Sequence, residues 1–373
     1  MAEKDFTLSL PDGMVNRGGW ERMKRVMRRA QNGEKITIAF LGGSITQGCL
    51  ATVHENCYAY LTYLWWKERY PKAEITYVNA GIGGTTSQFG IARVDQDVLS
   101  HHPDLVFLEF SVNDENTMFF QETYESLLRH IYGDASAPAV MLIHNIKYDD
   151  GKTAEKIHRE LGKYYQIPCV SMQPTIYAKM TAGNFGSRDV TEDDLHPNDR
   201  GHRMLADVIT YYLEQIDKEK ETVEEEIAMP SPLTADAYEY STRYQCMDCI
   251  PQMQGFVPDT REKDYYTDVY KGGWTAKEKG AEIHFHVEGS GIAVQFRQSV
   301  RRPAPIAKAI VDGDEEHAVI LDANFELDWG DNLALETVLY HGENKEHDLV
   351  IRIEETHEDD AVEFYLVSVI ASH

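Results

Sequence analysis

Four short blocks of the chain hold residue types that could together form a catalytic site. In the first block, Ser44 follows the pair Gly42-Gly43, directly after the apolar run 36–41. Glycines leave a serine Oγ exposed and let the backbone approach a substrate, although Gly-Gly-Ser after a strand is also a common turn. The block is not the Gly-x-Ser-x-Gly turn of α/β-hydrolases, because Thr46 occupies the last position, and it lacks the lysine of a phosphate-binding loop.

Two further blocks offer hydrogen-bond donors. Residues 79–87 contain Gly84, which could present a backbone N–H at the end of a strand. Residues 110–114 contain Asn113, whose side-chain amide could point into the same crevice. Each block has a structural alternative, a turn with a helix N-cap for the first and an Asx turn for the second.

The fourth block places Asp193 three residues before His196. An acid and a histidine on one turn can lie side by side, so that the carboxylate orients the imidazole. Asp-x-x-His also occurs often by chance. A serine hydroxyl is a poor nucleophile until a base accepts its proton, and histidine titrates near neutrality. Alone, the block is weak evidence for a catalytic site.

Taken together, the four blocks resemble the SGNH/GDSL hydrolase family in order and spacing, and residues 36–217 look like that family's domain throughout. The resemblance is closest in residues 84–93 and 106–114. There are two departures. Gly43 stands where the family usually has aspartate, and Ser111-Val112 replaces a more usual pair of glycines. Both variants are compatible with esterases of the family.

The resemblance implies a role for each of five residues. Ser44 would be the nucleophile, His196 the general base and Asp193 its orienting partner. The N–H groups of Ser44 and Gly84 and the side-chain amide of Asn113 would form the oxyanion hole. Such donors act where negative charge develops in the transition state. The implied reaction is ester cleavage through an acyl-enzyme.

The apolar pattern predicts the elements that must position these residues. Short apolar runs predict buried strands at 36–41, 75–78, 105–110, 140–143 and near 169. Helical patterns lie between and after them, at 58–70, 87–100, 121–132, 153–165 and 205–216. Continuous apolar runs suit parallel strands covered on both faces. Strand–helix alternation then predicts an α/β fold, a three-layer α/β/α sandwich with a parallel sheet and right-handed crossovers.

The pattern changes after residue 218. A glutamate-rich charge run at 217–226 and Met229-Pro230-Ser231-Pro232 are typical of a linker. Alternating segments such as 281–287, 292–296 and 347–353 then replace helical periodicity, which predicts an all-β sandwich or jelly roll. The expected organisation is a catalytic domain at 1–218, a linker at 219–234 and a β-sandwich at 235–373.

The C-terminal part resembles a galactose-binding-like sandwich of the carbohydrate-binding kind. The resemblance rests on the following segments: Gly273-Trp274, Gly280-Ala281, Val311-Asp312-Gly313, the stretch 321–325, Trp329-Gly330-Asp331 and the final strands. An SGNH domain followed by such a sandwich resembles the two-domain acetylesterases that deacetylate mannan or xylan oligosaccharides. That likeness makes Trp329 a candidate sugar-stacking residue, the alternative being a place in the sandwich core or edge. His144, at the end of the fourth predicted strand, could line the pocket or be an ordinary loop histidine.

Composition narrows the classes of partner. The 373 residues carry a formal net charge of −26, which disfavours phosphate backbones and anionic membranes and favours a neutral substrate. Neither a signal peptide nor a membrane span is expected. The five cysteines, Cys246-x-x-Cys249 among them, show no disulfide or zinc spacing. We expect a cytoplasmic protein without metal or cofactor, and a homodimer is compatible with the sequence.

The sequence therefore predicts a serine esterase that removes acetyl groups from plant oligosaccharides, most of all acetylated mannan. A lipid-directed esterase, lysophospholipase or thioesterase of the same fold is the alternative within enzymes. A sugar-binding protein without catalysis is the alternative from another class, and the complete set of site residues speaks against it.

Overall fold

The computed structural model of the protein describes residues 4–219 and 228–373. The chain divides into two compact units, Met1–Ala235 and Asp236–His373, and each is described by itself. Most of the predicted charge run at 217–226 lies outside the described residues.

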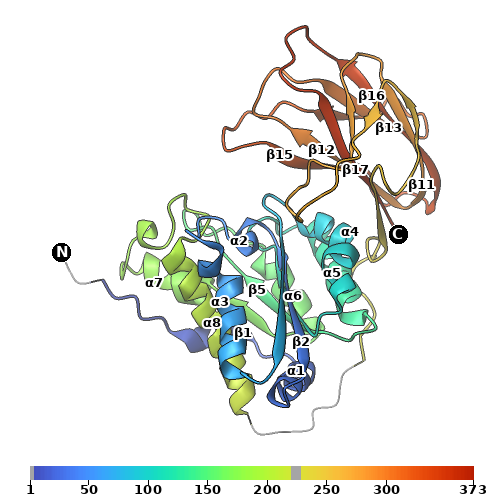
Figure 1. The fold of residues 1–373 in the computed structure, drawn as a ribbon. Coiled ribbons are helices and arrows are strands. Elements are labelled where there is room, and N and C mark those ends of the chain that lie inside the picture. The colour runs from blue at the N-terminus through green and yellow to red at the C-terminus, as the bar shows by residue number, and fades with distance from the viewer. Residues whose placement is uncertain (1–3, 220–227) are drawn as a thin grey trace. The chain divides into compact units, whose positions relative to one another are not determined.

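The first unit, drawn from blue to green in Figure 1, is built on a six-stranded sheet. The strand order is β1-β6-β5-β4-β2-β3. Its strands are β1 (Met14–Asn16), β2 (Lys35–Gly42), β3 (Glu74–Gly81), β4 (Leu105–Glu109), β5 (Ala139–His144) and β6 (Cys169–Ser171). Strands β2 to β6 pair in parallel, whereas β1 pairs antiparallel with β6. The predicted parallel sheet is confirmed, with one antiparallel strand added at its edge.

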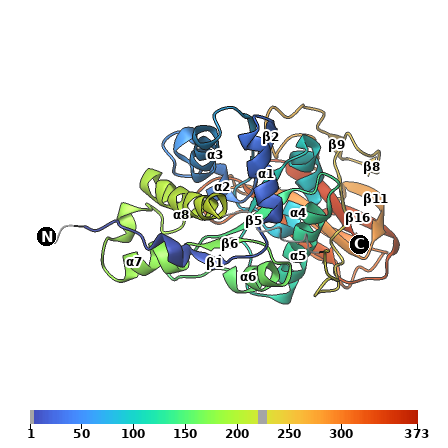
Figure 2. The ribbon, with the colours of Figure 1, turned by 90° about the horizontal axis from the view of Figure 1, so that it is seen from below.

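Helices cover both faces of this sheet (Figure 2). One face carries α1 (Glu21–Gln31), α3 (Tyr58–Arg69) and α8 (Asp199–Lys218), and the other carries α4 (Ser87–Asp97), α5 (Met118–Gly133) and α6 (Glu155–Tyr164). Two short helices, α2 (Ser44–Gln47) and α7 (Ala178–Thr181), complete the set. The three-layer α/β/α sandwich is confirmed. Among the described helices, none is long and apolar enough to cross a membrane.

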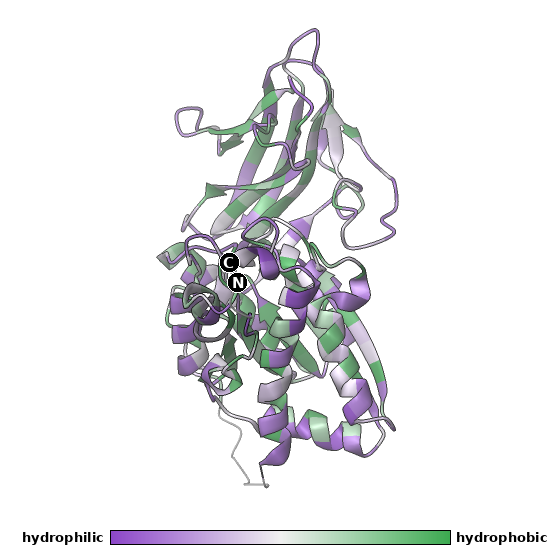
Figure 3. Cartoon of the chain, turned by 90° about the vertical axis from the view of Figure 1, so that its left-hand side faces the viewer, coloured by the Kyte–Doolittle hydropathy of each residue, from purple (hydrophilic) through white to green (hydrophobic). Residues whose placement is uncertain are grey.

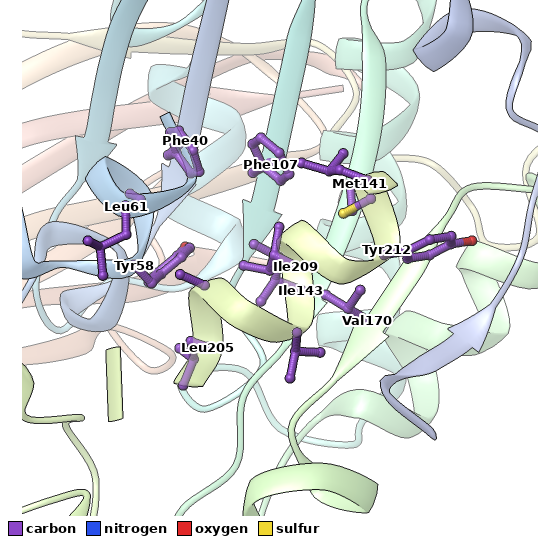
Figure 4. Packing of buried hydrophobic residues seen from close by; sticks show 14 of the residues in the cluster. Phe40, Tyr58, Leu61, Phe107, Met141, Ile143, Val170, Leu205, Ile209 and Tyr212 are labelled. Carbon is purple, nitrogen blue, oxygen red and sulfur yellow. The ribbon is translucent and has the colours of Figure 1, made fainter. Parts of the chain in front are cut away.

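The core forms because alternate residues of each buried strand point to opposite faces. On one face Phe40, Phe107 and Met141 meet Leu205 and Ile209 of α8 (Figure 4). Phe40 and Phe107, on neighbouring strands, stack with their ring centroids 4.6 Å apart. The packing fixes the sheet against α8, directly after the predicted acid–histidine turn.

Helix α1 and strand β1 were not predicted, and neither were the short helices α2 and α7. Helix α1 buries Met23, Val26, Met27 and Ala30, which recur at helical spacing and face the core. Strand β1 has only three residues, too few to carry a periodic signal. Both lie before the first predicted strand.

The chain that follows α8 returns to the surface of the first unit. The Arg129 guanidinium donates to the carbonyl oxygen of Pro230, and the Tyr164 hydroxyl donates to that of Ser231. The backbone N–H groups of Leu233 and Thr234 both donate to the carboxylate of Glu125. Part of the predicted linker is therefore bound to α5 and α6.

The second unit is all β. One sheet has the order β15-β12-β17-β10-β9, with β7 also pairing with β17, and the other has the order β14-β13-β16-β11-β8. The strands are β7 (Ser241–Tyr244), β8 (Gln252–Gln254), β9 (Val257–Pro258), β10 (Trp274–Ala276), β11 (Glu282–Gly289), β12 (Gly291–Gln298), β13 (Ile306–Val311), β14 (Val319–Asp322), β15 (Asn332–Leu339), β16 (Lys345–Glu355) and β17 (Phe364–Ser372). Hydrophilic and hydrophobic residues alternate along several of these strands (Figure 3), as in β11, where Ile283, Phe285 and Val287 are buried. The predicted β-sandwich is confirmed.

Candidate active site

Ser44 lies at the carboxyl end of the parallel sheet. Strand β2 ends at Gly42, and α2 begins at Ser44 itself. Ligands of open α/β sheets bind at this edge, because the loops after the strands converge there. The Ser44 side chain lies in a largely buried position, with 6% of the residue exposed.

The structure brings Ser44, His196 and Asp193 together from opposite parts of the unit. His196 Nε2 lies 2.8 Å from Ser44 Oγ, and His196 Nδ1 lies 2.6 Å from Asp193 Oδ2. The second contact assigns the ring proton to Nδ1, which donates to the carboxylate and leaves Nε2 free to accept from the serine hydroxyl. This is the arrangement of a nucleophile, a base and an orienting acid.

The acid is held in place by its own turn. Asp193 Oδ1 accepts hydrogen bonds from the backbone N–H groups of Leu195 and His196. Partial burial raises the pKa of the Asp193 carboxyl, but the side-chain and backbone hydrogen bonds from His196 and the backbone bond from Leu195 outweigh it, so the pKa is lowered overall. The group is therefore a carboxylate at neutral pH, as an orienting partner must be.

The three predicted oxyanion donors sit on three neighbouring turns. Ser44 follows β2, Gly84 lies between β3 and α4, and Asn113 lies between β4 and α5. Gly84 has a φ of +69°, a left-handed conformation that favours glycine. Within the described residues, the N–H groups of Ser44 and Gly84 and the side-chain amide of Asn113 donate to no protein acceptor. They are available to a substrate oxygen.

A crevice lies beside Asn113. It has a volume of 470 Å³ and is lined by residues 111–116 on one side and by Lys147 and residues 151–153 on the other. Val112 is the one apolar side chain among them, apart from glycine. The loop 145–154 bonds to both ends of the site, because Ala154 N–H donates to the Ser111 carbonyl oxygen and Tyr148 N–H donates to that of Asp194. The loop that supplies Lys147 and residues 151–153 to the crevice is thus fixed at both ends.

The structure does not support the expected substrate contact of His144. Its ring is completely buried, and within the described residues neither of its nitrogens has a hydrogen-bond partner. Burial lowers the pKa of His144 well below its usual value, and the neighbouring His158 and Arg159 lower it further. His144 is therefore a buried, neutral residue, and it is not among the residues that line the crevice.

Trp329 lies on an exposed loop of the second unit. Its side chain packs edge-on against Phe325, with ring centroids 5.0 Å apart, and 61% of the residue is exposed. Trp329 is therefore not part of the sandwich core. Its predicted contact with a sugar stays a prediction.

Several buried polar residues near the site were missed from the sequence. Burial raises the pKa of the Glu109 and Asp114 carboxyls to about 7 each. The titratable groups that face Glu109 are Asp114, Tyr58 and Tyr124. The sequence did offer one indication, which is the charged residue Glu109 at the end of an otherwise apolar strand. A buried charge requires hydrogen-bonding partners, and a core strand does not supply them.

Arg93 is a further missed residue. Its guanidinium, fully buried in α4, donates to the carbonyl oxygens of Ala80 and Gly42 and pairs with Asp97. It therefore binds the ends of β3 and β2 together, directly behind Ser44.

Among the described residues, no group of three or more His, Cys, Asp or Glu side chains could hold a metal ion. Cys246 and Cys249 carry free thiols, which donate to the carbonyl oxygens of Asp259 and Gln245.

The chain is similar to a known protein family and to solved structures. Residues 40–204 match the GDSL-like lipase/acylhydrolase family. A solved two-domain esterase active on acetylated mannans is 53% identical, with a TM-score of 0.97 over 98% of this chain and 99% of that one. Its form co-crystallised with mannopentaose is 52% identical, with a TM-score of 0.95 over 98% of each chain.

A more distant relative matches about half of the chain. The thioesterase 1/protease 1/lysophospholipase L1 of Escherichia coli strain K12 is 26% identical over 190 residues, which are 48% of this chain and 84% of that protein.

Proposed function

The chain belongs to the SGNH/GDSL hydrolase family and is a carboxylic ester hydrolase, and from that premise we propose that it removes acetyl groups from mannan-derived oligosaccharides through an acyl-enzyme on Ser44. One observation carries the proposal, the unbroken hydrogen-bond line from Ser44 Oγ through His196 to Asp193.

Acylation follows from this line of contacts. Ser44 Oγ attacks the acetyl carbonyl carbon while His196 Nε2 accepts the hydroxyl proton. The carbonyl oxygen becomes an oxyanion, which the Ser44 and Gly84 N–H groups and the Asn113 amide stabilise, each donor contributing on the order of 3 kcal/mol. Asp193 holds the imidazole and stabilises the imidazolium that forms. The C–O bond to the sugar then breaks, and His196 returns its proton to the departing sugar oxygen.

Deacylation repeats the same steps with water. His196 takes a proton from the water molecule that attacks the acetyl carbon, and the same three donors stabilise the second oxyanion. Collapse of this intermediate releases acetate, and the proton on His196 returns to Ser44 Oγ. The chain's own residues supply every proton transfer.

The crevice beside Asn113 supports a sugar rather than a lipid as the occupant. Its lining residues carry amide, carboxylate, hydroxyl and ammonium groups that can bond to sugar hydroxyls, and Val112 is the one apolar side chain among them apart from glycine. A net charge of −26 also favours a neutral substrate over an anionic one. The similarity to the mannan-active esterase, which extends through both units, points to mannan among neutral polysaccharides.

We propose in addition that the second unit binds part of the oligosaccharide. The supporting observation is the exposed indole of Trp329, since an exposed aromatic face can stack on the apolar face of a pyranose.

The test is mass spectrometry of acetylated manno-oligosaccharides before and after incubation with the wild type and with Ser44→Ala. The wild type should remove acetyl groups and Ser44→Ala should not. Acetylated xylo-oligosaccharides and the 4-nitrophenyl esters of acetate and octanoate serve as comparison substrates. Faster turnover of octanoate than of acetate, with no oligosaccharide deacetylated, would favour the lipid-directed alternative instead.

A further inference from the structure

Three side chains outside the triad connect the turns that carry the three oxyanion donors. The turns follow different strands and meet only at the carboxyl edge of the sheet. Ser44 also begins a helix of only four residues, α2, which is too short to fix its own direction. Something else must set the spacing between the donors.

Glu109 connects the Ser44 turn to the Asn113 turn. Its Oε1 accepts from both the N–H and the hydroxyl of Ser111, at 3.1 Å each. Its Oε2 lies 3.4 Å from the hydroxyl of Thr46, two residues after the nucleophile. Glu109 is fully buried, at the last position of β4, so both contacts are shielded from solvent.

Gln47 connects the Ser44 turn to the Gly84 turn. It is the last residue of α2, and its Oε1 accepts from the Gly83 N–H at 2.8 Å. Gly83 directly precedes the predicted donor Gly84. The Gln47 side chain therefore holds the backbone one residue before the Gly84 N–H.

Asp114 connects the Gly84 turn to the Asn113 turn. It follows Asn113 directly, and its Oδ1 accepts from the N–H of Ser87, which begins α4, at 2.9 Å. Its Oδ2 lies 3.1 Å from His158 Nε2. The His158 ring stacks on Tyr124 with centroids 3.5 Å apart, so this carboxylate is braced from α5 and α6.

We propose that Gln47, Glu109 and Asp114 are positioning residues that together set the spacing of the oxyanion hole. Each residue closes one side of a triangle whose corners are the turns of Ser44, Gly84 and Asn113. The inference rests on the proposed function, because it assumes that these donors meet the oxyanion. None of the three side chains touches the reacting atoms.

The triangle predicts a specific kinetic effect. Donors displaced by less than an ångström still admit the ester, but they bind the tetrahedral oxyanion less well. Removal of any one of the three connecting side chains should therefore lower kcat while leaving KM nearly unchanged. A residue that merely stabilised the fold would lower the melting temperature without this split.

The experiment measures kcat and KM for 4-nitrophenyl acetate, together with inhibition by methylboronic acid, whose tetrahedral serine adduct resembles the intermediate. Gln47→Ala and Glu109→Ala should each lower kcat by about tenfold or more, with KM within about twofold, and weaken the inhibitor by a similar factor. Gln47→Glu and Glu109→Gln keep an acceptor oxygen and should restore kcat to within about threefold of the wild type.

Asp104→Ala is the matched control. This carboxylate also joins two elements, since it accepts from the Thr37 N–H and pairs with Arg29, but it lies before β4, at the opposite end of the sheet. It should lower stability and leave kcat unchanged. If Glu109→Ala fails to fold, the half-buried Gln47 carries the test.

Two results would overturn the proposal. One is folded alanine variants with wild-type kcat, and the other is a loss of kcat without any loss of inhibitor affinity. Failure of the proposed function looks different, because the wild type and Ser44→Ala would then process esters equally.

Discussion

The side-chain oxygen of Asn113 occupies the space that a β-carbon on residue 43 would need. Any residue other than glycine at this position must push the Asn113 amide aside. The family usually has aspartate before its nucleophile. The observed position of the Asn113 side chain therefore requires the glycine that this chain has at residue 43. A departure from the family pattern is thus linked to the position of an oxyanion donor.

Gly43→Asp, which restores the family's usual residue, should lower kcat by about tenfold or more. The new side chain displaces the Asn113 amide, and the amide can move because it is the free end of a side chain. Stability should change little for the same reason. Kinetics with 4-nitrophenyl acetate and a thermal melt check both expectations, with Gly43→Ala as the smaller step. Unchanged kcat in both variants would show that Asn113 has room to shift without loss.

Ser44→Ala should lower kcat by several orders of magnitude and leave the fold intact, because the hydroxyl is the proposed nucleophile and alanine fills nearly the same space. Circular dichroism and kinetics on acetylated manno-oligosaccharides provide the measurement. Activity within about tenfold of the wild type would exclude Ser44 as the nucleophile.

Lys147→Ala should lower kcat/KM on acetylated manno-oligosaccharides by about fivefold, or ~1 kcal/mol, since one hydrogen bond to a sugar hydroxyl is lost. Hydrolysis of 4-nitrophenyl acetate should not change, because that small ester does not fill the crevice. Lys35→Ala is the control, being a lysine with an 82% exposed side chain at the start of β2. Equal losses for both lysines would indicate a general effect of charge.

Trp329→Ala should lower kcat/KM on the oligosaccharides by about tenfold, or ~1.4 kcal/mol, through loss of stacking. The exposed indole contributes little to the core, so a melt of the second unit should be unaffected. Turnover of 4-nitrophenyl acetate is the internal control. If the variant loses nothing on either substrate, Trp329 is not part of the substrate site.

Glu109→Gln should flatten the pH dependence of stability between about pH 6.5 and 8. The folded-state pKa of Glu109, about 7, lies above that of an unfolded glutamate, so the folded state binds more protons and loses stability as pH rises through 7. Asp114 acts in the same direction. His144 and His158 have lowered pKa values and are neutral across this window.

Urea unfolding of the wild type and of Glu109→Gln at the two ends of the window measures the effect. The wild type should lose more stability than the variant on going to the higher pH, by up to about 1 kcal/mol. Equal slopes for the two proteins would show that Glu109 does not titrate there.

The sequence predicted the five parallel strands of the sheet and the three residues, Ser44, His196 and Asp193, that the structure brings together. Strands such as β4 are apolar along their whole length because both faces are covered, and that pattern is visible without coordinates. Ser44 and His196 were identified because each stands in a recognisable sequence motif. The family resemblance pairs the two motifs although 152 positions separate the residues.

The rest depended on packing. The end of a strand does not reveal which face its last side chain joins, so the sequence left open whether His144 lines the pocket or is an ordinary loop histidine, and its ring is completely buried. Glu109 was passed over because its partners, Thr46 and Ser111, come from two different turns. Strand β1 exists only by pairing with β6, far along the chain.

That small strand has a consequence for handling the protein. Without β1, the edge of β6 would present unpaired backbone groups to other molecules, which is how sheets template aggregates. Asn16 strengthens the cover, because its side-chain amide donates to the carbonyl oxygens of Gly162 and Ile167. A change that removes β1 is therefore expected to lower the solubility of the protein in concentrated solution.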